Sequence, residues 1–458
     1  MIQLPEALVA AFPKGLFSQE PGDLDHYGKD WTRTFAAKPL GIAFPRSTDE
    51  VSKLLKLCSE MKIAVVPSGG RTGLSGGAMA SNGELVLSLT RMNKIGKVDL
   101  LSLTVEVEAG AVTEAVHHHA NEYDLTWPVD FGSKGSSTVG GNISTNAGGI
   151  NVIRYGMTRH WVLGLTVVLM SGEVLKLNGS LEKNNAGLDL KHLFIGSEGT
   201  LGVVTEAVLK LTPVESNTKL FFFGAKNHDK VFALLESCRQ QKFELHAFEA
   251  FSANCFEATT ALHKIPDPFS EKHAQYVLVE IKNQDTDSWL ETIFGYEIVA
   301  EGVEAASGED ARKFWKTRET ISESLSVRGH LHTSDISVAI RDMKDFLTEW
   351  EEIFARNYSA WELFVFGHFG DGNLHIHALK PASMSAEEFL QQNHAVEKDL
   401  YTLVQKFHGS VSAEHGVGLL KKADIGYTRA PNEVQLLKSL KKVFDPQGLL
   451  NPGKVVDV

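Results

Sequence analysis

Cysteine is scarce in this chain, and its scarcity excludes several kinds of protein. Among 458 residues only Cys58, Cys238 and Cys255 occur, at spacings that fit neither a zinc knuckle nor a disulfide framework. A reducing compartment is the simplest interpretation of so few cysteines. We therefore expect a cytoplasmic protein.

Basic residues are also fewer than acidic residues. The formal net charge is −12, which argues against a nucleic-acid-binding protein, because such proteins need a basic face to neutralise phosphates. A small anionic substrate would have to be attracted by a local cationic pocket. We expect a small-molecule substrate and no nucleic-acid partner.

Long apolar segments are missing as well. The longest strongly apolar stretch, WVLGLTVVLM at 161–170, is far shorter than the ~20 residues that span a bilayer. The N-terminal sequence MIQLPEALVAAFPKGLF lacks the basic region, apolar core and cleavage site of a signal peptide. We expect no integral membrane segment and leave open a peripheral contact at the inner face of a membrane.

The length of the chain predicts about two to four structural units. Between about residues 39 and 213, short β-rich runs such as 63–69, 84–89 and 163–170 alternate with helical stretches such as 49–61 and 111–123. This pattern favours an α+β domain at 1–214.

The pattern changes from about residue 215. Strand-like runs at 219–225 and 275–282 alternate with longer amphipathic helices at 228–241 and 341–357. We therefore predict a second domain at 215–415, built on an antiparallel sheet with flanking helices. A helical C-terminal segment at 416–458, ending in the turn-forming FDPQGLLNPGKVV, is expected to return to the first domain.

Three glycine-rich segments stand in the first domain. VPSGGRTGLSGG at 66–77 follows an apolar strand, a second segment at 130–149 contains twelve Gly, Ser and Thr residues, and a third lies at 193–204. Glycine lets backbone N–H groups turn inward around an anion, so a pyrophosphate suits such loops. The first segment is neither G-x-G-x-x-G nor the Walker lysine loop, and taken alone it could be only a flexible turn.

Together these segments resemble the FAD-binding (PCMH-type) domain of the vanillyl-alcohol oxidase and para-cresol methylhydroxylase superfamily, over nearly the whole chain. WPVDFGSKGSSTVGGNISTNAGG at 127–149, followed by RYG at 154–156 and VLGLTVVLMSGE at 162–173, is similar to the D-2-hydroxyglutarate and D-lactate dehydrogenase branch. The resemblance implies a two-subdomain FAD-binding domain, and non-covalent FAD, because the first loop has no histidine to carry a covalent link.

The same resemblance implies which residues contact FAD. They are Pro67, Ser68, Gly69, Gly70, Arg71, Thr72, Gly73, Leu74, Ser75, Asp130, Ser133, Gly140, Gly141, Ser144, Asn146, Gly149, Glu198, Gly202, Val204 and, from the returning tail, Asn451.

A histidine-rich segment at 363–377, LFVFGHFGDGNLHIH, reads as two strands around the turn 370–373. A hairpin closed by that turn would place His368 opposite His375, with Cβ atoms ~5 Å apart and both imidazoles able to reach one divalent ion. His377 would share that face. Each histidine taken alone could be an ordinary strand residue.

A third ligand is available in AEHGVG at 413–418, which offers Glu414 and His415 beside glycine turns. Two histidines and a carboxylate with open positions suit a catalytic Zn²⁺ or Mn²⁺. The resemblance assigns His368, His375 and Glu414 as metal ligands and His415 as the base. The run at 117–119, three histidines on an expected surface helix, is not expected to bind metal.

A substrate anchor is expected on the helix that contains KFWKTRETIS at 313–322, where Arg318 and Ser322 lie four residues apart on one face. An arginine can hold a carboxylate with two hydrogen bonds, although it could equally be an exposed residue paired with Glu319 or Glu323. The resemblance favours the substrate role, because the W-x-x-R-E element of that branch binds the carboxylate of the 2-hydroxy acid.

Two positions depart from the D-2-hydroxyglutarate enzymes. Thr333 stands where they have a substrate-contacting lysine, and His377 stands where they have an asparagine. Both changes remove or alter groups beside the substrate, so we do not expect a second, distal carboxylate to be bound as it is in that branch, and a monocarboxylate such as D-lactate becomes more plausible.

We therefore predict an FAD-dependent dehydrogenase of D-2-hydroxy acids. Arg318 anchors the carboxylate, the metal lowers the pKa of the hydroxyl, His415 takes the proton and the hydride passes to flavin N5. The acceptor that reoxidises the flavin is expected to be a quinone, an electron-transfer flavoprotein or a cytochrome, and the expected assembly is a homodimer.

Three alternatives stay open at this point. The chain could be an oxidase of glycolate or another 2-hydroxy acid that uses oxygen. It could be a flavin-binding subunit without turnover of its own. A metal-dependent hydrolase that holds a nucleotide in its glycine-rich loops would be colourless, unlike a flavoprotein.

Overall fold

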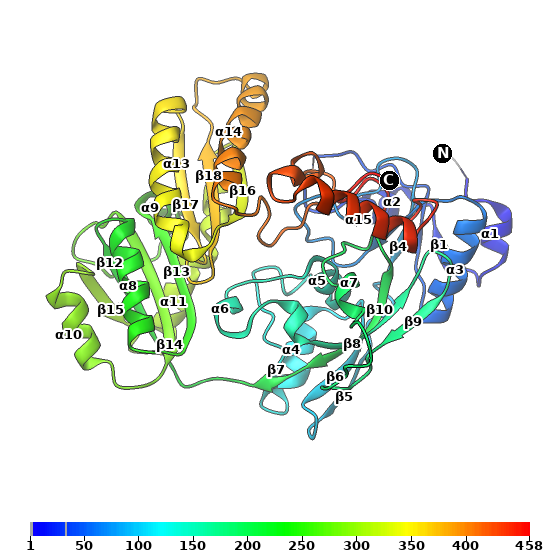
Figure 1. Cartoon of the computed structure of the whole chain (residues 1–458), viewed down its shortest axis with the longest axis horizontal. Coiled ribbons are helices and arrows are strands. Elements are labelled where there is room, and N and C mark those ends of the chain that lie inside the picture. Colours follow the sequence, from blue (N-terminus) through cyan, green and yellow to red (C-terminus); the bar gives the residue numbers. More distant parts are fainter. Residues whose placement is uncertain (1–2, 33) are drawn as a thin grey trace. The chain divides into compact units, whose positions relative to one another are not determined.

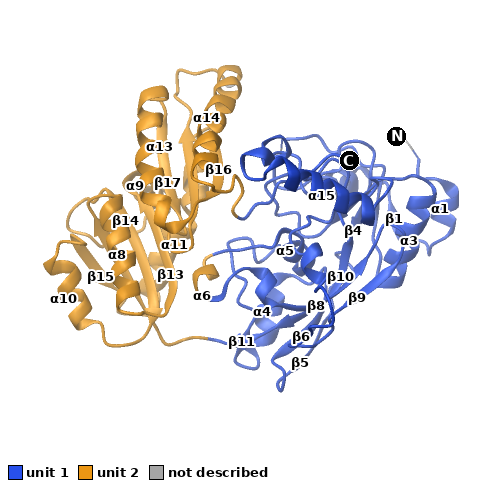
Figure 2. Cartoon of the chain, in the orientation of Figure 1, with its two compact units in different colours: residues 1–149, 155–214, 414–458 blue, residues 150–154, 215–413 orange. Residues whose placement is uncertain are grey.

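The computed structural model describes residues 3–32 and 34–458, which fold into two compact units (Figure 2). Unit 1 takes the described residues up to Gly149 together with Tyr155–Val214 and Glu414–Val458, and unit 2 takes Ile150–Arg154 and Glu215–Ala413. The short insertion 150–154 was expected in the first domain. It belongs to unit 2, in which Arg154 Nη2 lies 2.6 Å from Glu244 Oε1.

Unit 1 contains a mixed sheet with the order β1-β2-β4-β3, in which β2, β4 and β3 run parallel. Figure 1 labels β1 and β4 of this sheet. Helix α3 is capped by Ser47, whose side chain accepts a hydrogen bond from the Glu50 N–H. The elements of this part are α1 (Glu6–Ala10), β1 (Phe17–Ser18), α2 (Pro21–Tyr27), β2 (Gly41–Ala43), α3 (Thr48–Glu60), β3 (Val65–Ser68) and β4 (Leu85–Ser88).

A second sheet of unit 1 is antiparallel, with the order β5-β6-β10-β8-β9. Strand β8 is buried along its whole length, as its unbroken apolar sequence predicts. The elements are β5 (Ile95–Asp99), β6 (Thr104–Glu108), α4 (Thr113–Asn121), β7 (Leu125–Thr126), α5 (Val139–Thr145), η1 (Thr158–Trp161), β8 (Val162–Val168), β9 (Val174–Leu177), α7 (Lys191–Phe194), β10 (Val203–Lys210) and β11 (Thr212–Pro213), with α6 (Val152–Tyr155) at the junction with unit 2.

The C-terminal segment packs within unit 1, as expected from the sequence. It contains η3 (Lys422–Tyr427) and α15 (Pro431–Phe444). Lys441, which is buried, donates from Nζ to the carbonyls of Thr200 and Leu450 at 2.7 and 2.6 Å and pairs with Asp445 at 2.6 Å. These bonds fix the end of the chain to the loop that precedes β10.

Unit 2 is built on one antiparallel sheet with the order β15-β12-β14-β13-β17-β18-β16, which confirms the predicted antiparallel domain. Its elements are β12 (Thr218–Ala225), α8 (His228–Gln240), β13 (Leu245–Ser252), α9 (Ala253–His263), β14 (Gln275–Lys282), α10 (Asp287–Gly295), β15 (Glu301–Glu304), α11 (Gly308–Glu319), α12 (Ile321–Ser326), β16 (Leu331–Ser337), η2 (Ile340–Asp342), α13 (Met343–Asn357), β17 (Glu362–Gly367), β18 (Asn373–Leu379) and α14 (Ala386–Lys406).

Helices cover both faces of this sheet. Phe222 of β12 belongs to an apolar cluster with residues of α9, α11 and α12, whereas its neighbours Phe221 and Phe223 contact Trp289 of α10. Successive strand residues point to opposite faces, so α10 lies on the face opposite to α9, α11 and α12.

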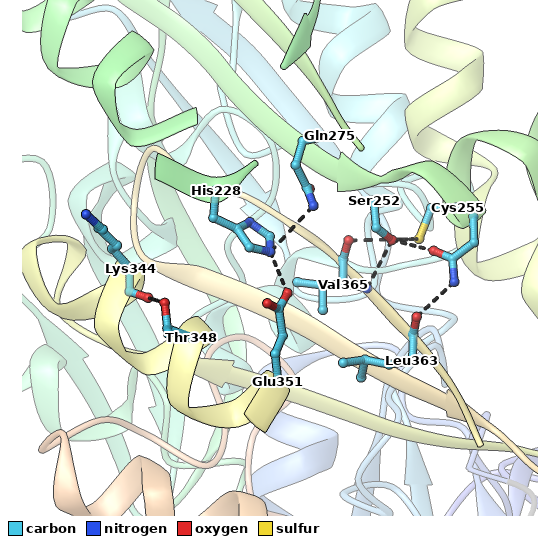
Figure 3. A network of polar contacts seen from close by, with 10 residues as sticks. His228, Ser252, Cys255, Gln275, Lys344, Thr348, Glu351, Leu363 and Val365 are labelled. Carbon is cyan, nitrogen blue, oxygen red and sulfur yellow. Dashed lines mark hydrogen bonds and ion pairs between the residues drawn. The ribbon is translucent and has the colours of Figure 1, made fainter. Parts of the chain in front are cut away.

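Polar contacts fix α9 to the sheet and join α8 to α13 (Figure 3). Ser252, at the end of β13, donates to Cys255 Sγ of α9 and accepts from the Val365 N–H of β17. His228 Nε2 lies 2.8 Å from Glu351 Oε1, which joins α8 to α13. None of the helices in the described ranges is both long and apolar enough to cross a bilayer.

Candidate functional site

The first two glycine-rich segments lie against each other in unit 1. A Cβ on Gly70 would stand 2.1 Å from the Ser136 carbonyl oxygen, and one on Gly69 would stand 2.4 Å from Thr138 Oγ1. Only glycine allows the two backbones to approach so closely. The segments 66–77 and 130–149 therefore form a single cradle.

Buried polar atoms of this cradle lack protein partners. Ser68 Oγ, Thr138 Oγ1 and Asn451 Oδ1 are buried and have no hydrogen-bond partner within the part of the chain that the structure describes. A buried unsatisfied polar atom costs free energy unless a ligand or water completes it. These three atoms fit the polar edges of the expected FAD.

All the residues expected to contact FAD lie in unit 1, and several also have partners within the protein. Arg71 donates from Nη1 to the Gly69 carbonyl at 3.2 Å, and its guanidinium lies over the Tyr27 ring at 4.6 Å. Asp130 pairs with Lys134 at 2.9 Å. Ser144 Oγ donates to the Gly140 carbonyl in α5, so its hydroxyl already has a structural acceptor.

Other expected FAD contacts shape the cradle through their backbone. Asn146 ends α5 with a φ of 51° and accepts the Arg159 N–H at its Oδ1. A Cβ on Gly202 would stand 2.5 Å from Val167 Cγ1, so this glycine permits close packing beneath β10. Leu74 is 42 % exposed, whereas Val204 is buried in β10.

Glu198 connects the third glycine-rich segment to the C-terminal segment. Its carboxylate accepts the N–H groups of Val417 and Gly418 at 2.7 and 2.8 Å, and burial raises its pKa. Asn451 also donates from Nδ2 to the Glu198 carbonyl at 2.7 Å. Glu198 thus positions the loop that follows His415.

Glu414 and His415 begin the C-terminal part of unit 1, whereas they were expected at the end of the second domain. Glu414 Oε1 accepts the Gly149 N–H at 2.7 Å, which joins the Glu-His-Gly loop to the second glycine-rich segment. In the chain, Glu414 directly follows Ala413, the last residue of unit 2.

The hairpin of unit 2 has a different register from the one expected. The structure pairs Phe366 with His375, whereas the four-residue turn predicted His368 at that position. Strand β17 ends at Gly367, with a φ of 154°, and the His368 carbonyl accepts the N–H groups of Asp371 and Asn373. The loop is therefore longer than predicted, and His368 lies at its beginning.

Despite this shift, the structure brings His368 and His375 together. Their ring centroids are 5.5 Å apart with an interplanar angle of 77°. His377, two residues further along β18, points to the same face as His375 and contacts the Phe366 ring. Two neighbouring imidazoles of this kind fit a divalent ion such as Zn²⁺ or Mn²⁺.

Each of these two histidines has a buried carboxylate behind it. His368 Nδ1 lies 2.7 Å from Glu249 Oε1, and His375 Nδ1 lies 3.7 Å from Asp335 Oδ1. Asp335, opposite His375 on β16, also accepts a hydrogen bond from Asn373 Nδ2. Histidines that bind metals are commonly oriented by a carboxylate in this way.

Arg318 is buried beside the same carboxylate. Its Nε donates to Glu249 Oε2 at 2.8 Å, and its guanidinium lies 5.4 Å from the Phe366 ring. Arg318 Nη2 is buried and has no hydrogen-bond partner among the described residues. Burial alone would raise the pKa of Glu249, but the charges of His368 and Arg318 hold this pKa below its usual value.

The expected shared face of Arg318 and Ser322 is wrong. Thr320 interrupts the predicted helix, so that α11 ends at Glu319 and α12 begins at Ile321. Arg318 is consequently buried while Ser322 is exposed. Thr333 is also exposed and lies directly opposite the buried His377.

The expected surface position of the histidine run on α4 is wrong for His117. Its side chain is buried and its Nε2 lies 3.0 Å from the Val129 carbonyl oxygen, while burial lowers its pKa. Because α4 packs against its own sheet through this face, His117 is a structural residue of unit 1.

Sequence reasoning missed Glu249, Asp335 and Thr138. Glu249 had a detectable signal, because it is the single carboxylate in the mostly apolar strand LHAFEAFS, and acidic residues are rarely buried unless paired. Thr138 had no such signal, since hydroxyl residues are common in that segment.

Comparison with known proteins places these features in context. Residues 39–178 match the family described as FAD binding domain, and residues 214–455 match the family described as FAD linked oxidases, C-terminal domain. A D-2-hydroxyglutarate dehydrogenase of Xanthomonas citri is 44% identical over 98% of this chain and 96% of its own length. A D-2-hydroxyglutarate dehydrogenase of Stutzerimonas stutzeri is 42% identical over 94% of each chain.

Solved structures of lower identity share the fold. A p-cresol methylhydroxylase with substrate bound has a TM-score of 0.75 at 15% identity, covering 98% of this chain and 96% of its own. An alkyldihydroxyacetonephosphate synthase has a TM-score of 0.74 at 19% identity, covering 98% and 86%. The likeness supports the predicted PCMH-type architecture.

Proposed function

Because this chain belongs to the family of FAD-linked oxidases, we propose that it oxidises D-2-hydroxyglutarate to the 2-oxo acid. It is an FAD-dependent D-2-hydroxy acid dehydrogenase, and relatives that are 44% and 42% identical are D-2-hydroxyglutarate dehydrogenases. The observation that carries the proposal is the buried, unsatisfied Nη2 of Arg318 beside paired histidines.

Arg318 binds the carboxylate next to the hydroxyl-bearing carbon. Its Nε is engaged by Glu249, and its buried Nη2 has an unused donor. A buried guanidinium with an open donor favours a carboxylate oxygen over water, because charge-assisted bonds strengthen in a dry site. Arg318 would therefore fix the substrate orientation.

His368 and His375, with Glu414 as the third ligand implied by the resemblance, would hold a divalent metal. A bound Zn²⁺ or Mn²⁺ supplies Lewis acidity that lowers the pKa of a hydroxyl. The support for this assignment is the imidazole pair of unit 2 and the carboxylates behind both rings. The names of the relatives mention no metal.

His415 is the proposed base that accepts the hydroxyl proton. Its loop is held by the bonds from Glu198 to Val417 and Gly418, so its position is defined by unit 1. FAD, when bound in the cradle of unit 1, supplies the acceptor for the hydride at flavin N5. We also propose that the residues of the glycine-rich segments contact FAD, as the resemblance implies.

D-lactate is the second candidate substrate. Thr333 replaces a lysine of the D-2-hydroxyglutarate enzymes and is exposed opposite His377. An exposed threonine offers no positive charge to a second carboxylate, which favours a monocarboxylate. The comparison of the two acids therefore belongs in the first experiment.

The electron acceptor, the assembly and the compartment are also proposed. We propose reoxidation by an external quinone, electron-transfer flavoprotein or cytochrome, and a homodimer as the assembly. The three cysteines are free and buried, which suits the reducing conditions of the cytoplasm. Peripheral contact with the inner face of a membrane stays compatible with this placement.

The experiment is an anaerobic titration of the purified protein followed by its visible spectrum. D-2-hydroxyglutarate, D-lactate, L-lactate and glycolate are added before and after chelation and restoration of Zn²⁺ or Mn²⁺. We expect a D-acid to bleach the flavin absorption at about 450 nm. This bleaching should be lost when the metal is chelated.

A His415→Asn variant is titrated in parallel. It should retain FAD while its rate of bleaching falls by about 10²–10⁴-fold, which is the usual contribution of a general base. A yellow protein that no D-acid bleaches would refute the substrate class, and unchanged bleaching in the variant would refute the role of His415.

A further inference from the structure

Glu249 is a fully buried carboxylate in the middle of β13, and only 1% of its surface is exposed. Each of its oxygens has its own partner. Oε1 lies 2.7 Å from His368 Nδ1, and Oε2 accepts Arg318 Nε at 2.8 Å. The charge therefore serves two residues that come from separate parts of unit 2, α11 and the loop after β17.

These two bonds decide which atoms of the partners stay available. An ionised carboxylate only accepts hydrogen bonds, so a neutral His368 ring carries its proton on Nδ1 and has its lone pair on Nε2. On Arg318, the engaged Nε leaves the buried Nη2 for another acceptor. One side chain thus selects both the histidine tautomer and the direction of the guanidinium fork.

We propose that Glu249 is a positioning residue that holds His368 and Arg318 as one rigid pair, so that binding of metal at His368 and of a carboxylate at Arg318 depend on each other. This inference rests on the proposed function and adds to it a residue that contacts neither the metal nor the substrate. Coupling of the two sites follows from geometry, since neither partner can turn without losing its bond to Glu249.

Charge and length both matter for this role. In Glu249→Gln the amide has one accepting oxygen and one donating NH₂ group, so one of His368 Nδ1 and Arg318 Nε must face a donor. In Glu249→Asp the charge remains, but a side chain shorter by one methylene cannot reach both partners at hydrogen-bond distance. The two variants therefore separate loss of charge from loss of reach.

Glu280→Gln provides the matched control. Glu280 lies on the neighbouring strand β14, is half-buried, and accepts a hydrogen bond from Thr218 Oγ1 at 2.7 Å. It removes a carboxylate from the same sheet without touching His368 or Arg318. Its metal affinity and substrate KM should match those of the unaltered protein.

The test measures the metal dissociation constant by competition with a chelator, together with KM and kcat for the best D-2-hydroxy acid. Removal of a group that orients a metal ligand typically weakens metal binding by about 10–100-fold. We expect this loss in Glu249→Gln, together with a rise in KM and unchanged FAD content. Glu249→Asp should give intermediate values.

A purely structural role would give another pattern. Glu249→Gln would then melt at a lower temperature, but its folded fraction would keep the original metal affinity and KM, and that result would overturn the proposal. If Glu249→Gln does not fold, Glu249→Asp carries the test alone. Metal affinity of Glu249→Asp equal to that of the unaltered protein would also overturn it.

A further measurement separates this proposal from the proposed function. Nitrogen-15 chemical shifts of the His368 imidazole report its tautomer in the metal-free protein, without substrate. The Nδ1-protonated form should dominate in the unaltered protein and in Glu280→Gln, but not in Glu249→Gln. If the protein oxidises no D-2-hydroxy acid, the proposed function fails. A tautomer that is insensitive to Glu249 overturns this inference instead.

Discussion

The two units build their candidate sites from different materials. Unit 1 offers a cradle made of backbone, in which Gly69 and Gly70 bring two loops into contact and hydroxyls such as Thr138 Oγ1 stay unsatisfied. Unit 2 offers charged side chains, in which Glu249 binds Arg318 and His368. A backbone cradle suits a large cofactor, whereas a compact set of charges suits one small substrate.

This difference teaches where each site is vulnerable. In unit 1 a substitution acts by steric exclusion, because the backbone donors remain whatever the side chain is. In unit 2 a substitution acts by leaving a buried charge without its partner.

Replacing Arg318 by methionine should produce the largest loss. The change leaves the buried Glu249 without its cationic partner on Oε2, and breaking a buried pair typically costs about 3–5 kcal/mol of stability. Urea denaturation measures this cost, and the substrate KM should rise in the folded fraction. Arg312→Met on the same helix removes an exposed charge and should stay within about 0.5 kcal/mol. Equal losses in both variants would contradict the contrast.

Lys454 is a buried cation of unit 1 and should make the stability of the protein depend on pH. Its Nζ donates to the Met79 carbonyl at 2.8 Å, and burial lowers its pKa from 10.5 to about 8. Between these two pH values the unfolded chain binds more protons than the folded one, so stability should rise with pH across this window. The rise is on the order of 2–3 kcal/mol, at ~1.4 kcal/mol per pH unit.

The measurement is the free energy of unfolding at pH 7.5 and pH 10 in the original protein and in Lys454→Met. The variant should lack the rise, since methionine does not titrate. The same pH-dependent gain in both proteins would exclude Lys454 as its origin.

Gly70→Ala tests the backbone cradle itself. The new Cβ would stand 2.1 Å from the Ser136 carbonyl oxygen, and overpacking of this kind costs about 1–3 kcal/mol. FAD content after purification should fall, with a decrease in affinity of roughly tenfold or more. Gly132→Ala is the control, because a Cβ there meets no heavy atom within 4 Å. Full FAD content in Gly70→Ala would show that the cradle tolerates displacement.

Much of the architecture could be read from sequence because its signals are local. The strand at 275–282 coincides with β14, and the helix expected at 228–241 corresponds to α8 (His228–Gln240). The glycine-rich segments of unit 1 could also be recognised from the sequence, since conformational freedom is a property of the glycine residue itself.

The errors have a common cause, which is that they depend on partners distant in the chain. The hairpin register was misjudged because Gly367 ends β17 early and the His368 carbonyl closes the loop. The face of Ser322 was misjudged because α11 and α12 separate at Thr320. A helical or strand period describes one element and does not specify where packing interrupts it.

The sequence by itself determined the α+β class and the glycine-rich segments that suit a pyrophosphate, because these follow from composition and short-range pattern, whereas FAD and the hydroxy-acid site were implied by the resemblance to a known family. Only the tertiary structure decided that Glu249 joins Arg318 to His368 and that Asp335 lies opposite His375. Glu249 and Arg318 are 69 residues apart in the chain, and no local pattern predicts such a pair. The pair forms because a carboxylate buried in a sheet requires charged partners, and folding brings α11 and the hairpin loop within its reach.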